Sequence, residues 1–258
     1  MSFEESYGSS PVVIFPERGQ SHGNFFAPSY RSILSNSDWK KRLAKVHTSG
    51  SLPRADRRWC ELDSSNSSDA LLMNIFCCPE VFQDGRVASF LGTDETAPEF
   101  GFKARVPLRE GKADRTEVDM RLGNLLVEAK LTETDFQTKS KELVDRYRDF
   151  ERVFRRRDLP QGKTTYSCYQ LIRNVLAADA LGCCFCVMLD ARRPDLLEQW
   201  YTVMRCVKDY ELRVRCKVLT WQELADVVTE ELQQFLDEKY GIRPGPLVPY
   251  AFEHLREE

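Results

Sequence analysis

The stretch TEVDMRLGNLLVEAKL, residues 116 to 131, decides how we interpret the rest of the chain. Its alternating apolar and polar residues predict two β-strands, and Gly123-Asn124 is a favoured two-residue hairpin loop. If these two residues form the turn, counting outward places Asp119 opposite Glu128. Opposed residues in a hairpin have Cβ atoms about 4.5 to 5.5 Å apart, so the two carboxylates would repel each other. The hairpin therefore needs something that offsets this repulsion.

The two faces of the predicted hairpin differ in polarity. One face is apolar and is expected to consist of Val118, Met120, Leu122, Leu125, Val127 and Ala129. The other carries Glu117, Asp119, Arg121, Leu126, Glu128 and Lys130. A hard divalent cation would offset the repulsion, because Mg²⁺ prefers oxygen ligands and commonly takes one or two carboxylates. A solvated face with a Glu117–Lys130 ion pair is the alternative; the turn, the register and the strand order favour a metal site with Lys130 beside it.

The overall composition indicates a globular protein without a membrane segment. The chain has 258 residues, of which 42% are hydrophobic and 30% charged, and its net charge is −3. That charge argues neither for nor against nucleic acid, because a basic patch can be local. No apolar run approaches the roughly 20 residues of a membrane span, and the N-terminus does not resemble a signal peptide, so we expect a cytoplasmic protein. The nine cysteines are expected to be small buried thiols, since Cys183, Cys184 and Cys186 lie in one very apolar run.

Periodicity and punctuation predict a mixed α/β sandwich around one sheet. Residues 1 to about 30 are expected to be irregular. Helices are expected at residues 36–47, 70–76, 134–157, 167–182, 194–208 and 221–240. Strands are expected at 99–108, 116–122, 124–131, 183–190 and 213–219. The alternation of strands and helices in the last part implies a partly parallel, covered sheet.

Asp119 and the tripeptide Glu128-Ala129-Lys130, together with this order of elements, resemble the PD-(D/E)XK nuclease superfamily. The resemblance covers about residues 67 to 235, although Val118 stands where the family usually has proline. It implies an α/β restriction endonuclease-like core of αβββαβ type, with a mixed central sheet flanked by helices. We expect residues 1–66 to form an N-terminal arm and helix, 67–241 the nuclease-like domain, and 242–258 an irregular tail.

The resemblance also implies a catalytic site. Asp119, Glu128 and the backbone carbonyl of Ala129 would bind Mg²⁺, with Mn²⁺ as a substitute, and Lys130 would orient or activate the attacking water. Further candidates are Asp69, Glu117, Gln170 and Arg173, and weaker ones are Glu61, Asp63 and Glu99. Gln170 and Arg173 are three residues apart and share a helix face, so Gln170 could support the site and Arg173 contact phosphate.

Residues 145 to 158 combine arginines with aromatic side chains, a composition that suits a phosphate backbone. The candidates for nucleic-acid contacts are Arg121, Arg148, Arg152 and Arg155. Acidic residues alternate with these arginines, so ion pairs within the helix are the alternative use.

The function implied by the resemblance is Mg²⁺-dependent hydrolysis of phosphodiester bonds in double-stranded DNA, in defence or repair. Double-strand cutters often act as homodimers, although no self-complementary surface is evident from this sequence. Two alternatives stay open: a nuclease directed at RNA, and an inactive nuclease fold that binds nucleic acid or a protein.

Overall fold

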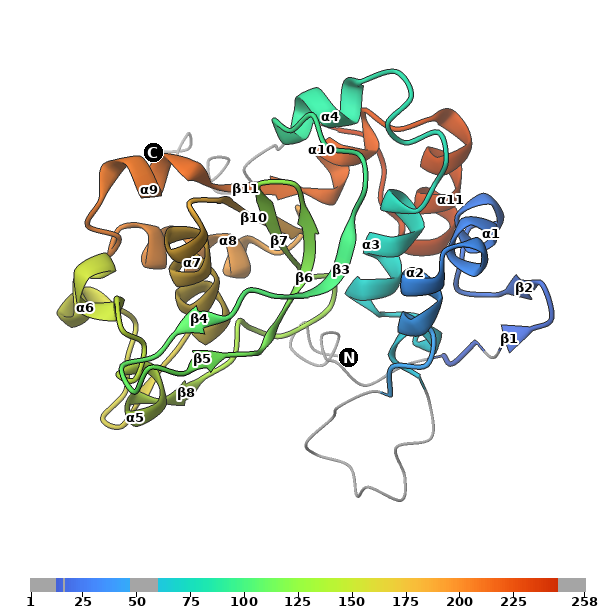
Figure 1. Cartoon of the computed structure of the whole chain (residues 1–258). Coiled ribbons are helices and arrows are strands. Elements are labelled where there is room, and N and C mark those ends of the chain that lie inside the picture. Colours follow the sequence, from blue (N-terminus) through green and yellow to red (C-terminus); the bar gives the residue numbers. More distant parts are fainter. Residues whose placement is uncertain (1–12, 16, 47–59, 246–258) are drawn as a thin grey trace, which may run out of the picture.

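A five-stranded mixed sheet forms the centre of the structure, a computed structural model that describes residues 13–15, 17–46 and 60–245 (Figure 1). The strand order is β11-β10-β7-β6-β3. The strands are β3 (Glu99–Lys103), β6 (Glu117–Leu122), β7 (Leu125–Ala129), β10 (Cys184–Leu189) and β11 (Cys216–Thr220). The β3–β6 and β6–β7 pairs are antiparallel, whereas β7–β10 and β10–β11 are parallel. The predicted mixed sheet is confirmed.

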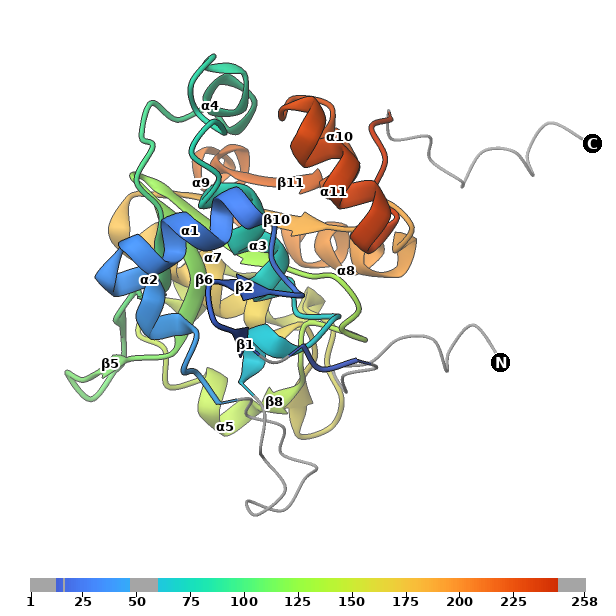
Figure 2. The ribbon, with the colours of Figure 1, turned by 90° about the vertical axis from the view of Figure 1, so that its right-hand side faces the viewer.

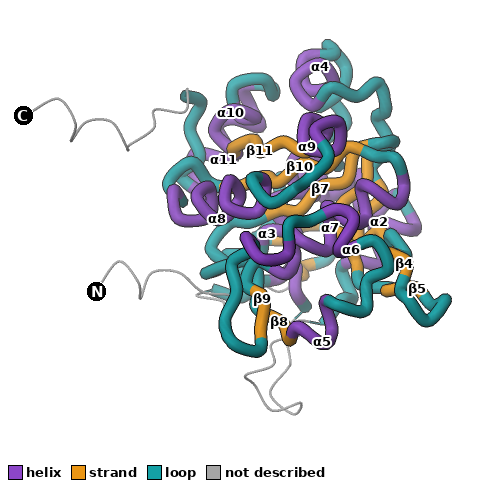
Figure 3. Tube along the Cα trace, turned by 90° about the vertical axis from the view of Figure 1, so that its left-hand side faces the viewer, coloured by secondary structure: helices purple, strands orange, loops and turns teal. Residues whose placement is uncertain are grey.

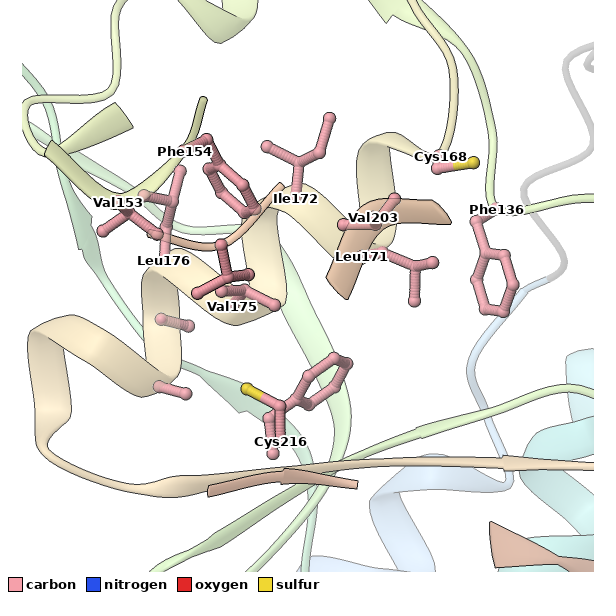
Figure 4. Packing of buried hydrophobic residues seen from close by; sticks show 14 of the residues in the cluster. Phe136, Val153, Phe154, Cys168, Leu171, Ile172, Val175, Leu176, Val203 and Cys216 are labelled. Carbon is pink, nitrogen blue, oxygen red and sulfur yellow. The ribbon is translucent and has the colours of Figure 1, made fainter. Parts of the chain in front are cut away.

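Helices cover both faces of this sheet (Figures 1 and 2). The first apolar layer, cluster 1, packs α7 (Tyr169–Leu181), α8 (Pro194–Met204) and α9 (Tyr210–Arg215) against the sheet. Figure 4 shows part of it, with residues of α7 such as Leu171 and Val175 beside Val203 of α8. The second layer, cluster 2, packs α3 (Ser68–Phe76), α4 (Arg86–Leu91), α10 (Trp221–Ala225) and α11 (Glu230–Tyr240) against the opposite face. The order α3-β3-β6-β7-α7-β10 matches the expected αβββαβ core.

The hairpin has the predicted register. Met120 pairs with Val127, and Leu122 with Leu125, across the Gly123-Asn124 turn. Gly123 has a φ of +58°, a left-handed conformation that glycine adopts without steric cost, and a Cβ at this position would overlap Glu95. Local propensity and the hydrophobic pattern therefore agree at this turn.

One member of the expected apolar face is misplaced. Val118 packs in cluster 1, on the side of Leu126, whereas Met120 packs in cluster 2. The neighbouring strand changes sides at the same level, because Phe102 contacts cluster 1 and Phe100 contacts cluster 2. Gly101, between these two phenylalanines, has a φ of +66°, which interrupts the regular alternation of the pleat. The prediction that Val118 shares a face with Met120 was wrong for this reason.

The N-terminal region contains more regular structure than expected. A short hairpin, β1 (Glu17–Arg18) and β2 (Ser21–His22), precedes α1 (Ala27–Ser35) and α2 (Ser37–Arg42), and the 3₁₀ helix η3 (Glu61–Asp63) follows. The helix expected at 36–47 is shorter: it corresponds to α2, which ends at Arg42, and residue 47 lies outside the described residues, whereas α1 was not expected. Asn36 separates the two helices, and its side chain accepts from the backbone N–H groups of Asp38 and Trp39. A third apolar cluster, containing Tyr30, Ile33 and Met73, packs α1 on α3.

The long helix expected at 134–157 is absent. The chain there forms β8 (Lys139–Ser140), α5 (Lys141–Val144), α6 (Phe150–Val153) and the 3₁₀ helix η4 (Arg156–Asp158). Backbone bridges from Tyr147 to Leu108 and from Phe154 to Val207 pull the segment out of a single helix, so tertiary pairing overrides the helical pattern. β8 pairs with β9 (Thr165–Tyr166), and β4 (Val106–Pro107) pairs with β5 (Ala113–Asp114) (Figure 3).

Smaller differences concern the C-terminal third. Residues 213–215 are the end of α9 rather than strand, and the helix expected at 221–240 is divided into α10 and α11. Residues 246–258 of the expected irregular tail lie outside the described residues. The cysteines are free, and all except Cys60 and Cys184 are buried, as predicted. Within the described ranges, no helix combines the length and the apolar character needed to cross a membrane.

Candidate functional site

Asp119 and Glu128 lie just beyond the last paired residues of the β6–β7 ladder, which ends at Met120–Val127. The backbone N–H of Ala129 donates to Asp119 Oδ2 at 2.8 Å. The Asp119 carboxylate thus accepts the backbone N–H that a carbonyl of the neighbouring strand would otherwise accept. This hydrogen bond holds the Asp119 side chain at the end of β7 that carries Glu128. The hairpin brings the two predicted carboxylates together.

Glu128 is completely buried and contacts four polar side chains. Lys130 Nζ donates to Glu128 Oε1 at 2.9 Å, and Gln170 Nε2 donates to the same oxygen at 2.7 Å. Asn174 Nδ2 donates to Glu128 Oε2 at 2.7 Å, and Arg173 Nη2 lies 3.7 Å from that oxygen. Burying a carboxylate is costly unless it is paired and hydrogen-bonded, and these contacts meet both requirements.

The pKa values of Asp119 and Lys130 are both raised, for different reasons. Burial, followed by the negative charge of Glu128, raises the pKa of Asp119 well above its ordinary value. Burial acts to lower the pKa of Lys130, but the charges of Glu128, Glu133 and Asp119 outweigh it, so the pKa of Lys130 is raised. Lys130 therefore stays protonated at neutral pH, a state that suits electrostatic attraction of an anion and does not suit a neutral base.

Helix α7 supplies the supporting side chains on one face. Gln170, Arg173 and Asn174 follow an i, i+3, i+4 pattern, so all three reach Glu128. Arg173 also donates to the backbone carbonyl of Glu117 at 2.8 Å and is buried, so its contacts are with the site itself. Sequence analysis missed Asn174, although its spacing of four residues from Gln170 was the available signal.

A second group of charges lies beside the hairpin and joins α2 to α3 and β6. Arg42 donates to Asp69 Oδ2 at 2.8 Å and to Glu117 Oε2 at 3.0 Å. Lys45 Nζ lies 2.9 Å from Glu61 Oε2 and 3.3 Å from Asp69 Oδ2. Asp69 and Glu117, both expected near the site, are thus neutralised by two cations that sequence analysis did not identify.

Three contacts hold Arg42 in this position. Trp39, one helical turn earlier, donates to the carbonyl of Pro98 at 3.0 Å and packs edge-to-face on Phe100. The Arg42 guanidinium passes over Gly101, where any Cβ would overlap it. Asp69 also adds to the raised pKa of Asp119, so the two groups of charges act on each other.

The other predicted candidates lie elsewhere. Asp63 Oδ1 lies 3.1 Å from His22 Nε2, away from Asp119 and Glu128, and Glu99 is exposed at the start of β3. Arg121 donates to the carbonyl of Gly123 at 2.7 Å and covers the ring of Phe102. The arginines of the 145–158 segment are ion-paired: Arg148 with Asp149, Arg152 with Asp149 and Asp179, and Arg155 with Asp158.

The donor set fits a Mg²⁺ ion. Among the described residues, no group of three or more His, Cys, Asp or Glu side chains is arranged to hold a metal. Mg²⁺ nevertheless commonly takes only one or two carboxylates and keeps several waters, which Asp119 and Glu128 can satisfy. In addition, Gln170 Oε1 is buried beside Glu128 and has no hydrogen-bond partner among the described residues. An unsatisfied amide oxygen at this place suits a cation or one of its waters.

Comparison with known protein families gives one match. The model of the family REase-ARP, described as "Restriction Endonuclease associating with ARP", matches residues 5–241. Neither the comparison with curated proteins nor that with solved structures gave a match. The family model spans most of the chain, including the hairpin, α7 and the charge cluster of α2. The chain therefore belongs to the REase-ARP family of restriction endonuclease-like nucleases.

Proposed function

We propose that this chain is a Mg²⁺-dependent nuclease of the PD-(D/E)XK type that hydrolyses phosphodiester bonds in double-stranded DNA. The observation that carries the proposal is the convergence of Asp119, Glu128 and Lys130 at one end of the β6–β7 hairpin. The negative charge of Glu128 contributes to the raised pKa of Asp119, and a divalent ion bound by both carboxylates would offset their repulsion.

Each side chain has a defined task in this proposal. Asp119 and Glu128 bind the ion, and the Ala129 N–H fixes the orientation of the Asp119 carboxylate. Gln170 and Asn174 hold Glu128 from the α7 side. When bound, Mg²⁺ lowers the pKa of water and neutralises charge that develops on the phosphate.

Lys130 is charged and is held by Glu128 2.9 Å away. An ammonium group at this place attracts the phosphate and stabilises negative charge that grows in the transition state. Hydrolysis of the P–O bond consumes one water and leaves one phosphomonoester and one hydroxyl. By the resemblance, the phosphate stays on the 5′ end.

The biological setting belongs to the proposal as well. The family description supports an association with ARP for this chain, and the resemblance supports a role in defence against foreign DNA or in repair. One catalytic centre per chain would make a homodimer the simplest assembly for cutting both strands.

Incubation with closed circular duplex DNA, closed circular single-stranded DNA, linear duplex DNA and RNA tests the activity. Each substrate is offered in Mg²⁺, in Mn²⁺ and in chelator, beside an Asp119→Asn variant purified identically. We expect metal-dependent cleavage of closed duplex circles by the wild type and none by the variant. Cleavage of RNA alone, or cleavage of every substrate in chelator, would contradict the proposal.

A further inference from the structure

The β4–β5 hairpin carries three cations that have no acidic partner. Arg105, Lys112 and Arg115 are exposed, and the described residues offer none of them an ion pair or a side-chain hydrogen bond. Together with Gly111 and Ala113 they line a surface depression of about 430 Å³. Three positive charges without an ion pair among the described residues, around one hollow, produce a local positive potential on a chain whose net charge is −3.

This hairpin differs from the arginine-rich segment that follows it. Arg148, Arg152 and Arg155 are equally exposed, yet each has a carboxylate within ion-pair distance, so their field is largely neutralised. A phosphate that approached them would have to compete with Asp149, Asp179 or Asp158. Among the described residues, the cations of the β4–β5 hairpin have no such competitor within ion-pair distance, because the acids of the hairpin have other partners. Glu110 accepts from Arg146, and Asp114 accepts from Tyr147.

Asp114 connects the hairpin to the helix that supports Glu128. Tyr147 donates its hydroxyl to Asp114 Oδ2 at 2.5 Å, and the hydroxyls of Tyr147 and Tyr169 lie 2.8 Å apart. Tyr169 is the first residue of α7, directly before Gln170. The positive charge of Arg173 also contributes to the lowered pKa of Asp114, after the hydrogen bonds from Thr116 and Tyr147 have overcome the effect of burial.

The hairpin is also close to Asp119 along the chain. Figure 1 shows β4 and β5 continuing from the ends of β3 and β6. Arg115 precedes Asp119 by four residues, so their Cα atoms are separated by no more than about 14 Å. Arg105 has a φ of +53°, an uncommon conformation for a residue other than glycine, between the buried Ala104 and Val106. The fold thus holds this arginine outward at a conformational cost.

We propose that Arg105, Lys112 and Arg115 form the surface that binds the DNA backbone beside the scissile phosphate. This inference rests on the proposed nuclease function and adds where the duplex lies. Because lysine and arginine contact phosphates without reading bases, binding at this surface is independent of sequence and strongly dependent on salt. The arginine-rich segment contributes little to it.

Two triple variants of equal charge change test the surface. The hairpin variant carries Arg105→Gln, Lys112→Gln and Arg115→Gln, and the matched control carries Arg148→Gln, Arg152→Gln and Arg155→Gln. Binding of the full chain to a fluorescent duplex is measured by anisotropy in chelator, across a salt titration. Thermal melting first confirms that each variant is folded, and the single Lys112→Gln and Arg115→Gln variants replace the triple if it is not.

The hairpin variant is expected to bind at least about tenfold more weakly at low salt. Its slope of log K against log salt should be shallower by about 2.7, at about 0.9 per lost phosphate contact. The control should differ from the wild type by less than about twofold.

The outcomes separate the two proposals. A hairpin variant with wild-type affinity and slope, in a protein that still cleaves DNA, overturns the surface and leaves the nuclease intact. The same holds if the control loses as much affinity as the hairpin variant. A wild-type protein that binds no DNA overturns both proposals together.

Discussion

Lys130 Nζ lies 2.9 Å from Glu128 Oε1, and both side chains are almost fully buried. Asp119, the residue directly before the first paired residue of the ladder, accepts a hydrogen bond from the backbone N–H of Ala129, and its pKa is raised by burial and by Glu128. The contacts of Glu128 therefore stabilise the fold, and Glu128 is also a candidate metal ligand. The negative charges of Asp119 and Glu128 repel each other, and a bound cation would offset this repulsion. The two carboxylates should consequently respond in opposite ways to removal of their charge.

Replacement of Glu128 should destabilise the protein without metal. Glu128→Gln leaves the ammonium of Lys130 and the guanidinium of Arg173 buried without their carboxylate, a loss of about 3–5 kcal/mol for a broken buried ion pair. Denaturant unfolding in chelator measures it. An unfolding free energy within about 0.5 kcal/mol of the wild type would show that the pair does not exist in solution.

Replacement of Asp119 should stabilise the protein without metal. Asp119→Asn keeps the shape but removes the repulsion with Glu128, so Tm in chelator should rise by on the order of 2–4 °C, the shift that about 1 kcal/mol produces in a chain of this size. Addition of Mg²⁺ should raise Tm of the wild type and leave that of the variant unchanged. A lower Tm for the variant in chelator would contradict the electrostatic interpretation.

The effect of Asp119 should depend on pH with a defined sign. Its folded-state pKa is raised above the ordinary value of 3.8, so the folded state binds this proton more tightly than the unfolded state. The resulting stability is present below pH 3.8 and is lost as the pH rises through the folded-state pKa. The Tm of wild type minus that of Asp119→Asn should therefore fall with rising pH in chelator and then level off. A difference that is constant with pH would disprove the shift.

Gln170 should affect metal affinity because it orients the carboxylate of Glu128. Removal of a partner that orients a ligating carboxylate typically costs 10–100-fold in affinity, so Gln170→Ala should weaken Mn²⁺ binding by about tenfold or more. Calorimetric titration of Mn²⁺ measures the change. Gln234→Ala on the exposed side of α11 is the control, because the Gln234 side chain donates to Glu238 on the same helix. Equal Mn²⁺ affinities of the two variants would remove Gln170 from the site.

Arg42 should stabilise the charge cluster that joins α2 to the hairpin. Arg42→Gln leaves Asp69 and Glu117 with Lys45 alone, and we expect a loss of about 1–3 kcal/mol of unfolding free energy. Arg86→Gln breaks the exposed pair with Asp84 and should cost less than about 1 kcal/mol. Similar losses for the two variants in denaturant unfolding would mean that the Arg42 cluster is a surface feature.

The hairpin and the central strand could be predicted because local signals agree there with the fold. Gly123-Asn124 sets the register, and the apolar run of β10 matches a strand buried between two parallel neighbours. Val118 could not be placed correctly, because the break at Gly101 belongs to the adjacent strand. The prediction of one helix at 134–157 was wrong for a similar reason. Its apolar spacing suits a helix, but its backbone pairs with Leu108 and Val207.

The candidate site shows the same limit. Gln170 and Arg173 were found because both lie on one turn of one helix. Arg42 meets Glu117 across 75 residues, and no periodic pattern links two such positions. Among the described residues, the arginine-rich segment is ion-paired and Arg105, Lys112 and Arg115 are not, and a sequence does not show which charges find a partner.

The central claim is that the end of the β6–β7 hairpin is the catalytic centre. The most direct measurement is the single-turnover rate of duplex cleavage in Mg²⁺ by the wild type, by Lys130→Ala and by the control Lys41→Ala. Lys41 is an exposed lysine that pairs with Asp38 on the same helix. The account predicts a loss of at least about 100-fold for Lys130→Ala, as for removal of one group that stabilises developing charge, and no change for the control. A Lys130→Ala protein that is folded and cleaves at the wild-type rate would place the chemistry elsewhere.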